Sequence, residues 1–294
     1  MTTKNKLNFS VEQNTRNCHT VRMGVTNSKW EQWFLLSTDR HHDNAHTIHE
    51  LETKHLKQAK ERGAGIVDAG DLFCAMQGKY DRRSSRSACR VEQQGTDCYL
   101  DSLVDTASEF YAPYAENFIV IGRGNHETAI LKNHETDLTD RLCDRMTYLS
   151  GHKVYSGGYG GWVRFMIKFN GSTTQCLCKY YHGSGGGGPV TRGVIQTNRM
   201  AVIYPQAQII MSGHTHDQWI VPVAREKLHK NGKIGMDETV HVRCGTYKDE
   251  YQDGYGGWHV ERGAAPKTLG AIWLRFYSEN AHNNTVGWDF TRAK

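Results

Sequence analysis

Six polar side chains in this sequence each follow a short apolar run and could together bind metal ions. They are Asp39, Asp71, Asn125, His182, His214 and His216. Two carboxylates, an amide oxygen and several imidazoles form a donor set that suits Mn²⁺, Fe, Zn²⁺ or Ni²⁺ better than Ca²⁺, which prefers oxygen ligands alone. We therefore expect a site for transition metals.

The segment SGHTHDQW places two histidines, His214 and His216, two residues apart after the apolar run AQIIM. This spacing suggests a pair of ligands turned toward one site. The donors are numerous enough for two metal ions if one carboxylate bridges them. Two ions about 3.5–4 Å apart can share a hydroxide and bind a phosphoryl group during in-line displacement.

The first half of the chain predicts alternating strands and helices. Short apolar runs bounded by glycine are typical of buried strands in a largely parallel sheet. Ile48, Leu51, His55 and Ala59 follow helical spacing between the first two runs. The predicted strands lie in 31–43, 63–73 and 116–128, and the predicted helices lie in 45–62, 98–114 and 135–149.

The second half is mostly β. Alternation around the NGS turn predicts a hairpin over 161–183. The other predicted elements are a helix in 192–204, a strand in 207–216, and two strand pairs, 218–228 with 239–247 and 271–278 with 286–290. This order favours a sandwich of two sheets with outer helices over two independent domains. The candidate ligands follow the carboxyl ends of strands, where ligands bind in open α/β sheets.

Five motifs in order, TDRH, AGDLF, GRGNHE, YYHG and SGHTH, extend over about residues 37–217. This series resembles the calcineurin-like metallophosphoesterase family. The resemblance implies an α/β fold, a four-layer α/β/β/α sandwich of two mixed sheets with outer helices. We expect a single domain over 1–294, with a motif core of about 31–220 and with 221–294 completing the second sheet.

The resemblance also implies a role for each motif residue. One metal would be bound by Asp39, His41 and His216, the other by Asn125, His182 and His214, with Asp71 bridging the two. A metal-bridging hydroxide would attack phosphorus. His126, oriented by Glu127, would stabilise or protonate the leaving oxygen.

Two departures from the family pattern leave alternatives open. The family often has a second acid after the bridging aspartate, and Cys74 stands at that position. No glycine follows the first motif, so His42 competes with His41 as the ligand. His42, His46 and His49 recur at helical spacing, which we interpret as a solvated or partly packed helix face rather than a third metal site. The segment 183–193, rich in glycine, lacks the spacing of a phosphate loop and is expected to be flexible.

The substrate signals point in two directions. GDLF and the basic segment after it, which includes Arg82 and Arg83 as candidate substrate contacts, resemble the DNA-repair nuclease branch of the family. RGNHE resembles the Ser/Thr protein phosphatases, in which the arginine, here Arg123, grips phosphate. The chain lacks their GDxVDRG motif. We therefore predict a phosphodiesterase or nuclease, with a phosphomonoesterase or protein phosphatase, or a non-catalytic scaffold, as the alternatives.

The composition is that of an ordinary globular protein, with 38% hydrophobic and 23% charged residues. The net charge of +5 mildly favours phosphate-bearing partners such as DNA or RNA. The sequence contains neither an apolar run of about 20 residues nor a secretory signal, so we expect a cytoplasmic protein without a membrane span. Cys176 and Cys178 are expected to be core thiols. The oligomeric state is not predicted by the sequence.

Overall fold

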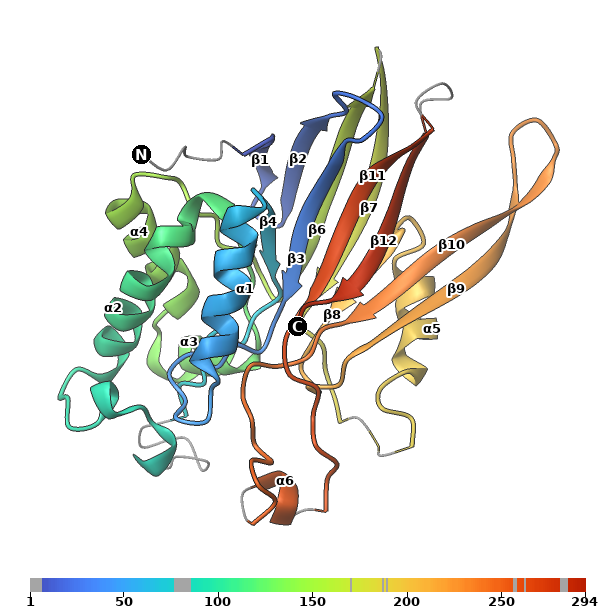
Figure 1. Cartoon of the computed structure of the whole chain (residues 1–294). Helices are drawn as coiled ribbons and strands as arrows, with labels where there is room; N and C mark the ends of the chain where they lie inside the picture. The colour runs from blue at the N-terminus through green and yellow to red at the C-terminus, as the bar shows by residue number, and fades with distance from the viewer. Residues whose placement is uncertain are drawn as a thin grey trace.

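Two β-sheets, packed face to face, form the centre of the molecule (Figure 1). The computed structural model describes residues 7–76, 86–169, 171–186, 188, 190–255, 258–261, 263–280 and 285–294. Within these residues, no helix combines the length and the apolar character that a membrane span requires.

The five-stranded sheet contains the strands of the first half of the chain. Its parallel strands β3, β4 and β5 each end beside a loop that carries candidate ligands. An antiparallel hairpin completes the sheet next to β3. The order is β12 (Thr285–Arg292), β11 (Ile272–Asn280), β3 (Glu31–Ser37), β4 (Gly65–Asp68) and β5 (Phe118–Ile121).

The seven-stranded sheet is also mixed, because β2 pairs with β6 and β8 pairs with β7 and β10 in parallel, while the other neighbours are antiparallel. Side chains alternate between buried and partly buried along most of β6, as expected for a strand with one core face. The order is β1 (Phe9–Thr15), β2 (Cys18–Gly24), β6 (Gly160–Phe169), β7 (Ser172–Tyr181), β8 (Ile209–Ser212), β10 (Ile234–Arg243) and β9 (Trp219–Leu228).

The helices lie outside the sheets, with α1 to α4 on one side in Figure 1 and α5 on the other. The α-helices are α1 (His49–Glu61), α2 (Tyr99–Tyr111), α3 (Asn125–His134), α4 (Leu138–Ser150), α5 (Ile195–Ile203) and α6 (Trp258–Glu261). The described residues also form the 3₁₀-helices η1 (Arg86–Ala88), η2 (Val91–Gln93) and η3 (Ala112–Asn117). The predicted fold class, two mixed sheets with outer helices, is confirmed, although α5 forms the second helical layer with a single short helix.

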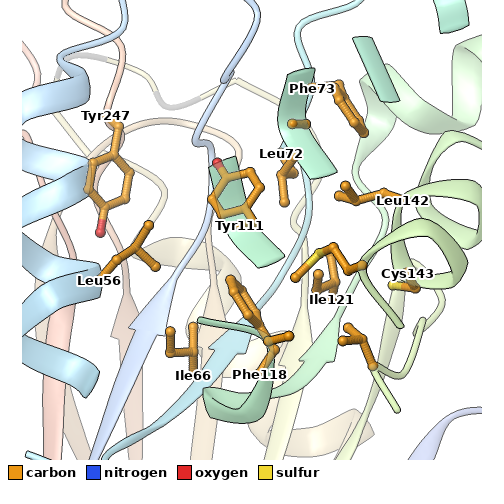
Figure 2. Close-up of a cluster of buried hydrophobic side chains, with 14 of the residues drawn as sticks. Leu56, Ile66, Leu72, Phe73, Tyr111, Phe118, Ile121, Leu142, Cys143 and Tyr247 are labelled. Atoms are coloured by element: carbon orange, nitrogen blue, oxygen red, sulfur yellow. The ribbon is translucent and has the colours of Figure 1, made fainter. Parts of the chain in front are cut away.

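Two hydrophobic clusters hold these layers together. One lies between the sheets and includes Phe34, Phe165 and Phe276, whose rings are in mutual contact. The other joins the five-stranded sheet to the helices, and Figure 2 shows Leu56 and Phe118 among its buried side chains. The strands of the five-stranded sheet whose carboxyl ends carry candidate ligands are therefore packed between two buried clusters.

The expectation that 221–294 completes the second sheet is only half right. The β9–β10 hairpin extends the seven-stranded sheet, but β11 and β12 return to the sheet of β3. The reason is that β11 is apolar on both faces: Ile272, Leu274 and Phe276 are fully buried between the sheets, and Trp273 lies in the cluster that joins the five-stranded sheet to the helices. The hairpin β1–β2 and helix α3 were not predicted.

A buried ionic network fixes the loop after β3. Arg40 donates from Nη1 to Glu52 of α1 at 2.9 Å and from Nε to Asp68 of β4 at 2.7 Å, and all three side chains are fully buried. It also donates to Ser37 at the end of β3. Arg40 therefore joins β3, β4 and α1 directly behind the two candidate ligands that flank it in sequence.

We predict that Arg40→Met lowers the free energy of unfolding by about 3–5 kcal/mol, because it leaves two buried carboxylates without their cation. The matched control is Arg275→Met, since the Arg275–Asp289 pair is roughly one-third exposed and such pairs contribute about 0–1 kcal/mol. Urea denaturation measures both values. Equal losses for the two variants would contradict the assigned role of the network.

Candidate metal centre

All seven predicted metal ligands converge on one region. Each lies in a loop just past the carboxyl end of β3, β4, β5, β7 or β8, or at the start of α3, and most are buried. They are Asp39, His41, Asp71, Asn125, His182, His214 and His216.

Several ligands have an unusual backbone conformation. Positive φ angles, between 46° and 72°, occur at Asp39, His41, Asp71, His214 and His216. Such angles are uncommon outside glycine and cost on the order of 1–3 kcal/mol each in sparsely populated regions. These conformations turn the chain sharply at the strand ends and direct the side chains inward.

Glycines beside the ligands permit close approach of the loops. A Cβ on Gly124 would collide with the carboxylate of Asp71, and a Cβ on Gly213 would collide with Asp39 and Thr38. The glycines of GRGNHE and SGHTH are therefore required by the packing of the motifs against each other.

The first donor group contains Asp39, His41 and His216, whose candidate ligand atoms all lie within 4.8 Å of one another. Nε2 of His41 is 3.2 Å from Nε2 of His216, which in turn is 3.4 Å from Oδ1 of Asp39. At most one proton can lie between two such imidazole nitrogens. A divalent cation would satisfy all three atoms at once, so this group fits a metal ion.

The second donor group contains Asp71, His182 and His214, again within 4.8 Å. Nε2 of His182 is 3.1 Å from Oδ2 of Asp71, and Oδ1 of Asn125 is 2.7 Å from Nδ1 of His214. Nδ1 of His182 donates to the carbonyl oxygen of Ala69, which leaves Nε2 as the donor atom for a metal. This group also fits a metal ion.

The electrostatics of His182 agree with a cation site. Burial lowers the pKa of His182, but the charge and hydrogen bond of the Asp71 carboxylate, together with the charges of Asp39 and Glu127, outweigh this effect and raise the pKa to about 9. A proton is therefore held between these side chains near neutral pH. A divalent ion would take its place, since a metal ligand must be unprotonated.

Asp71 belongs to the second group and is also tied to the loop of the first. Its main-chain carbonyl accepts a hydrogen bond from the amide of His41, and its Oδ1 accepts one from the amide of His126. Its Oδ2 faces His182. The bridging role of this carboxylate stays a prediction, which these contacts support.

His126 lies at the start of α3 and lines the cavity described below. Its Nδ1 donates to the carbonyl oxygen of Cys74, and its Nε2 is 3.8 Å from Oδ2 of Asp71. The expectation that Glu127 orients His126 is wrong, because a main-chain carbonyl has that position. Cys74 thus orients the ring through its backbone, although its side chain is not the acid of the family pattern.

Glu127 instead fixes the main chain. Its carboxylate accepts hydrogen bonds from the amides of Asp71, Phe73 and Gly124, at 3.1, 2.8 and 2.8 Å. Burial, together with the charge of Asp71, raises the pKa of Glu127 to about 8. This side chain holds the loop after β4 against the start of α3.

Asp43 supports the same loop, and its only signal in the sequence is its place near the first motif. Its carboxylate accepts hydrogen bonds from the amides of Cys74 and Ala75, the latter at 2.8 Å. Asp43 therefore supplies the acidic support that is missing at position 74.

The structure does not place Arg123 in the candidate site. Its guanidinium pairs with Asp137 and Asp140 of α4, and the side chain is absent from the described lining of the cavity. Asp137 is the N-cap of α4 and Asp140 lies in its first turn, so both carboxylates hold the guanidinium at this helix end. Arg82 and Arg83, the other expected substrate contacts, lie outside the described residues.

His41 rather than His42 faces the first donor group. His42 is fully buried near Glu52 and Tyr111 and precedes α1, so the expected solvated or partly packed helix face is wrong for this residue, while His46 is exposed. His42, His49 and Glu52 also lie close together. However, Arg90 contacts His49 at 2.8 Å and Arg40 contacts Glu52, so guanidinium groups already occupy this cluster.

A cavity of about 850 Å³ opens above the donor groups. His41, Asp71, His126 and His214 form part of its wall. Another part of the cavity wall comes from a segment that sequence reasoning missed. Its lining residues are Lys248, Glu250, His259, Glu261 and Lys267. Because this segment lies more than 30 residues beyond the last motif, spacing gave no signal for it.

No protein-family model matches the chain, and no curated protein matches it. Among solved structures, it is similar to vacuolar protein sorting 29 from Cryptosporidium parvum, with 11% identity, a TM-score of 0.38, and coverage of 90% of this chain and 98% of the other.

Two further structures are similar at the same low level. A conserved uncharacterised protein from Streptococcus pneumoniae, described as a predicted phosphoesterase, has 9% identity and a TM-score of 0.34, with 90% of this chain and 91% of the other covered. Vacuolar protein sorting 29 from Entamoeba histolytica, solved in complex with zinc, has 10% identity and a TM-score of 0.33, with 90% and 100% covered. At these values the assignment of a site depends on this chain's own residues.

We predict that the protein, loaded with Mn²⁺ and then freed of excess metal, retains two ions per chain. His216→Ala removes a donor from the first group, so we expect about one ion. The matched control is His229→Ala, which replaces an exposed histidine in the β9–β10 turn and should retain two ions per chain. Elemental analysis after gel filtration gives the numbers, and equal metal content in all three proteins would refute the assignment.

We further predict that Glu127→Ala lowers the free energy of unfolding by about 3 kcal/mol or more, because three amides lose their acceptor and each such loss costs roughly 1–3 kcal/mol when buried. Glu135→Ala, at the other end of α3, should change it by less than about 0.5 kcal/mol. Thermal and urea denaturation measure the difference. If Glu127→Ala changed the free energy of unfolding as little as Glu135→Ala, the assigned role of Glu127 in fixing the loops would be wrong.

Proposed function

We propose that this protein is a phosphoester hydrolase that uses two divalent metal ions, and that it acts as a phosphodiesterase on nucleic acid or nucleotides. The observation that carries the proposal is the presence of two donor groups, Asp39–His41–His216 and Asp71–His182–His214, at one cavity with His126. Mn²⁺ is our first choice of metal, and Fe, Zn²⁺ or Ni²⁺ also suit the donors.

The two ions, when bound, would activate water and neutralise charge on the phosphoryl group. The protein would contribute the fixed positions of the donors. Asn125 supports this arrangement, since its amide oxygen contacts both His182 and His214. The buried loops behind the ligands would limit movement of the donors during turnover.

His126, protonated on both ring nitrogens, would transfer its Nε2 proton to the leaving oxygen and become neutral. Donation from its Nδ1 to the carbonyl of Cys74 fixes the ring and directs Nε2 toward Asp71 and the cavity. A positioned imidazole of this kind contributes roughly 10²–10⁴-fold to a rate as a general acid.

The preference for a diester over a monoester has two supports. The cavity is open enough for a substrate with groups on both sides of phosphorus, at about 850 Å³. The pairing of Arg123 with two aspartates removes the contact that favoured a protein phosphatase. The retention of all expected ligands favours catalysis over a scaffold role.

We predict that the Mn²⁺-loaded protein hydrolyses bis(p-nitrophenyl) phosphate faster than p-nitrophenyl phosphate. His126→Ala should retain the metal and lose about 10²–10⁴-fold in kcat, because only the proton donor is removed. Asp71→Asn should lose both activity and metal. The matched control is His229→Ala, which should equal the wild type.

A panel of single- and double-stranded DNA, RNA, cyclic nucleotides and a phosphopeptide, assayed with Mn²⁺, would identify the substrate class. Hydrolysis of the monoester alone would overturn the diesterase proposal. Full turnover by a folded His126→Ala protein would overturn the role of the histidine.

A further inference from the structure

The cavity wall contains two described residues with a permanent positive charge, Lys248 and Lys267. Lys267 pairs with Asp217 at 3.0 Å. Lys248 is deeper, with a side chain only 7% exposed, and its ammonium group contacts Glu250 and lies 3.9 Å from the sulfur of Cys74. Because the main chain of Cys74 holds His126, this ammonium group is close to the proposed proton donor.

The backbone of Lys248 is tied to the first metal-binding loop. The carbonyl oxygen of Asp39 accepts hydrogen bonds from the hydroxyl of Thr246 at 2.8 Å and from the amide of Tyr247 at 3.1 Å. Lys248 itself forms a β-bridge with Thr47. The main chain of Lys248 is therefore held beside the first metal-binding loop, and its side chain reaches the cavity from there.

The ion pair of Lys248 with Glu250 is one in which another anion could replace Glu250. A buried ammonium ion is costly to desolvate and needs an anion beside it, which Glu250 supplies. Glu250 also lies 3.3 Å from Nε2 of His259, so it keeps a polar neighbour when Lys248 turns away. A phosphate group in the cavity could thus replace Glu250 as the partner of Lys248.

We propose that Lys248 binds a non-bridging oxygen of the substrate's phosphoryl group, and that Glu250 holds Lys248 in the free enzyme and competes with that phosphate. This assignment gives Lys248 the role that the sequence motif suggested for Arg123. It rests on the proposed phosphoesterase function, because it concerns the same cavity.

The test measures the binding of inorganic phosphate to the Mn²⁺-loaded full chain by calorimetry, with metal content checked in each variant. Lys248→Met should weaken phosphate binding about 10- to 100-fold, the usual effect of losing a charge-assisted hydrogen bond. Lys248→Arg should recover part of this loss. Glu250→Gln should bind phosphate at least as tightly as the wild type, because the competing carboxylate is gone.

Lys227→Met is the matched control, since Lys227 pairs with Asp237 on the β9–β10 hairpin, and it should bind phosphate like the wild type. If the Lys248–Glu250 pair were only structural, Lys248→Met and Glu250→Gln would weaken binding alike, and this result would overturn the proposal. Unchanged binding by Lys248→Met, or no phosphate binding by the wild type, would also overturn it.

Kinetics on bis(p-nitrophenyl) phosphate separate this proposal from the function itself. A wild type that retains metal and binds phosphate through Lys248 but hydrolyses no ester would refute the proposed function alone. An active wild type whose kcat/KM is unchanged in Lys248→Met would refute the role of Lys248 alone.

Discussion

The buried carboxylate of Glu127 is the interaction on which the arrangement of the candidate centre depends. It accepts hydrogen bonds from the amides of Asp71, Phe73 and Gly124, which belong to two loops that are more than 50 residues apart in sequence. Without a common acceptor, these amides would be buried and unsatisfied, at a cost of about 1–3 kcal/mol each. The carboxylate thereby fixes Asp71 relative to the start of α3, where Asn125 and His126 lie.

A second constraint acts on the first loop. Arg40 joins it to β4 and α1, while the carbonyl of Asp39 accepts hydrogen bonds from Thr246 and Tyr247. These contacts compensate for the strained φ angles of Asp39 and His41. Rigid loops of this kind keep donor atoms close together and so favour a cation between them.

Much of the fold, and the convergence of the candidate ligands on one region, could be predicted from the sequence, because the apolar runs before Asp39, Asp71 and His214 mark buried strands and their ends. The hairpin β1–β2 escaped prediction, since FSVEQNT is largely exposed and has a weak alternation of apolar residues. Arg123 was misjudged because its partners, Asp137 and Asp140, belong to another helix.

The support around the centre could not be read from local patterns either. Asp43 accepts hydrogen bonds from the amides of Cys74 and Ala75, which follow it by 31 and 32 positions in the sequence. Lys248 reaches the cavity from beyond the last motif. Such contacts arise from tertiary packing, and their residue types have no distinctive spacing.

The central claim is that a pair of divalent cations shares the carboxylate of Asp71. Anomalous diffraction from crystals of the Mn²⁺-loaded protein tests it most directly. The account predicts two peaks about 3.5–4 Å apart with the Asp71 carboxylate between them. A single peak, or two peaks without Asp71 in contact with both, would contradict it.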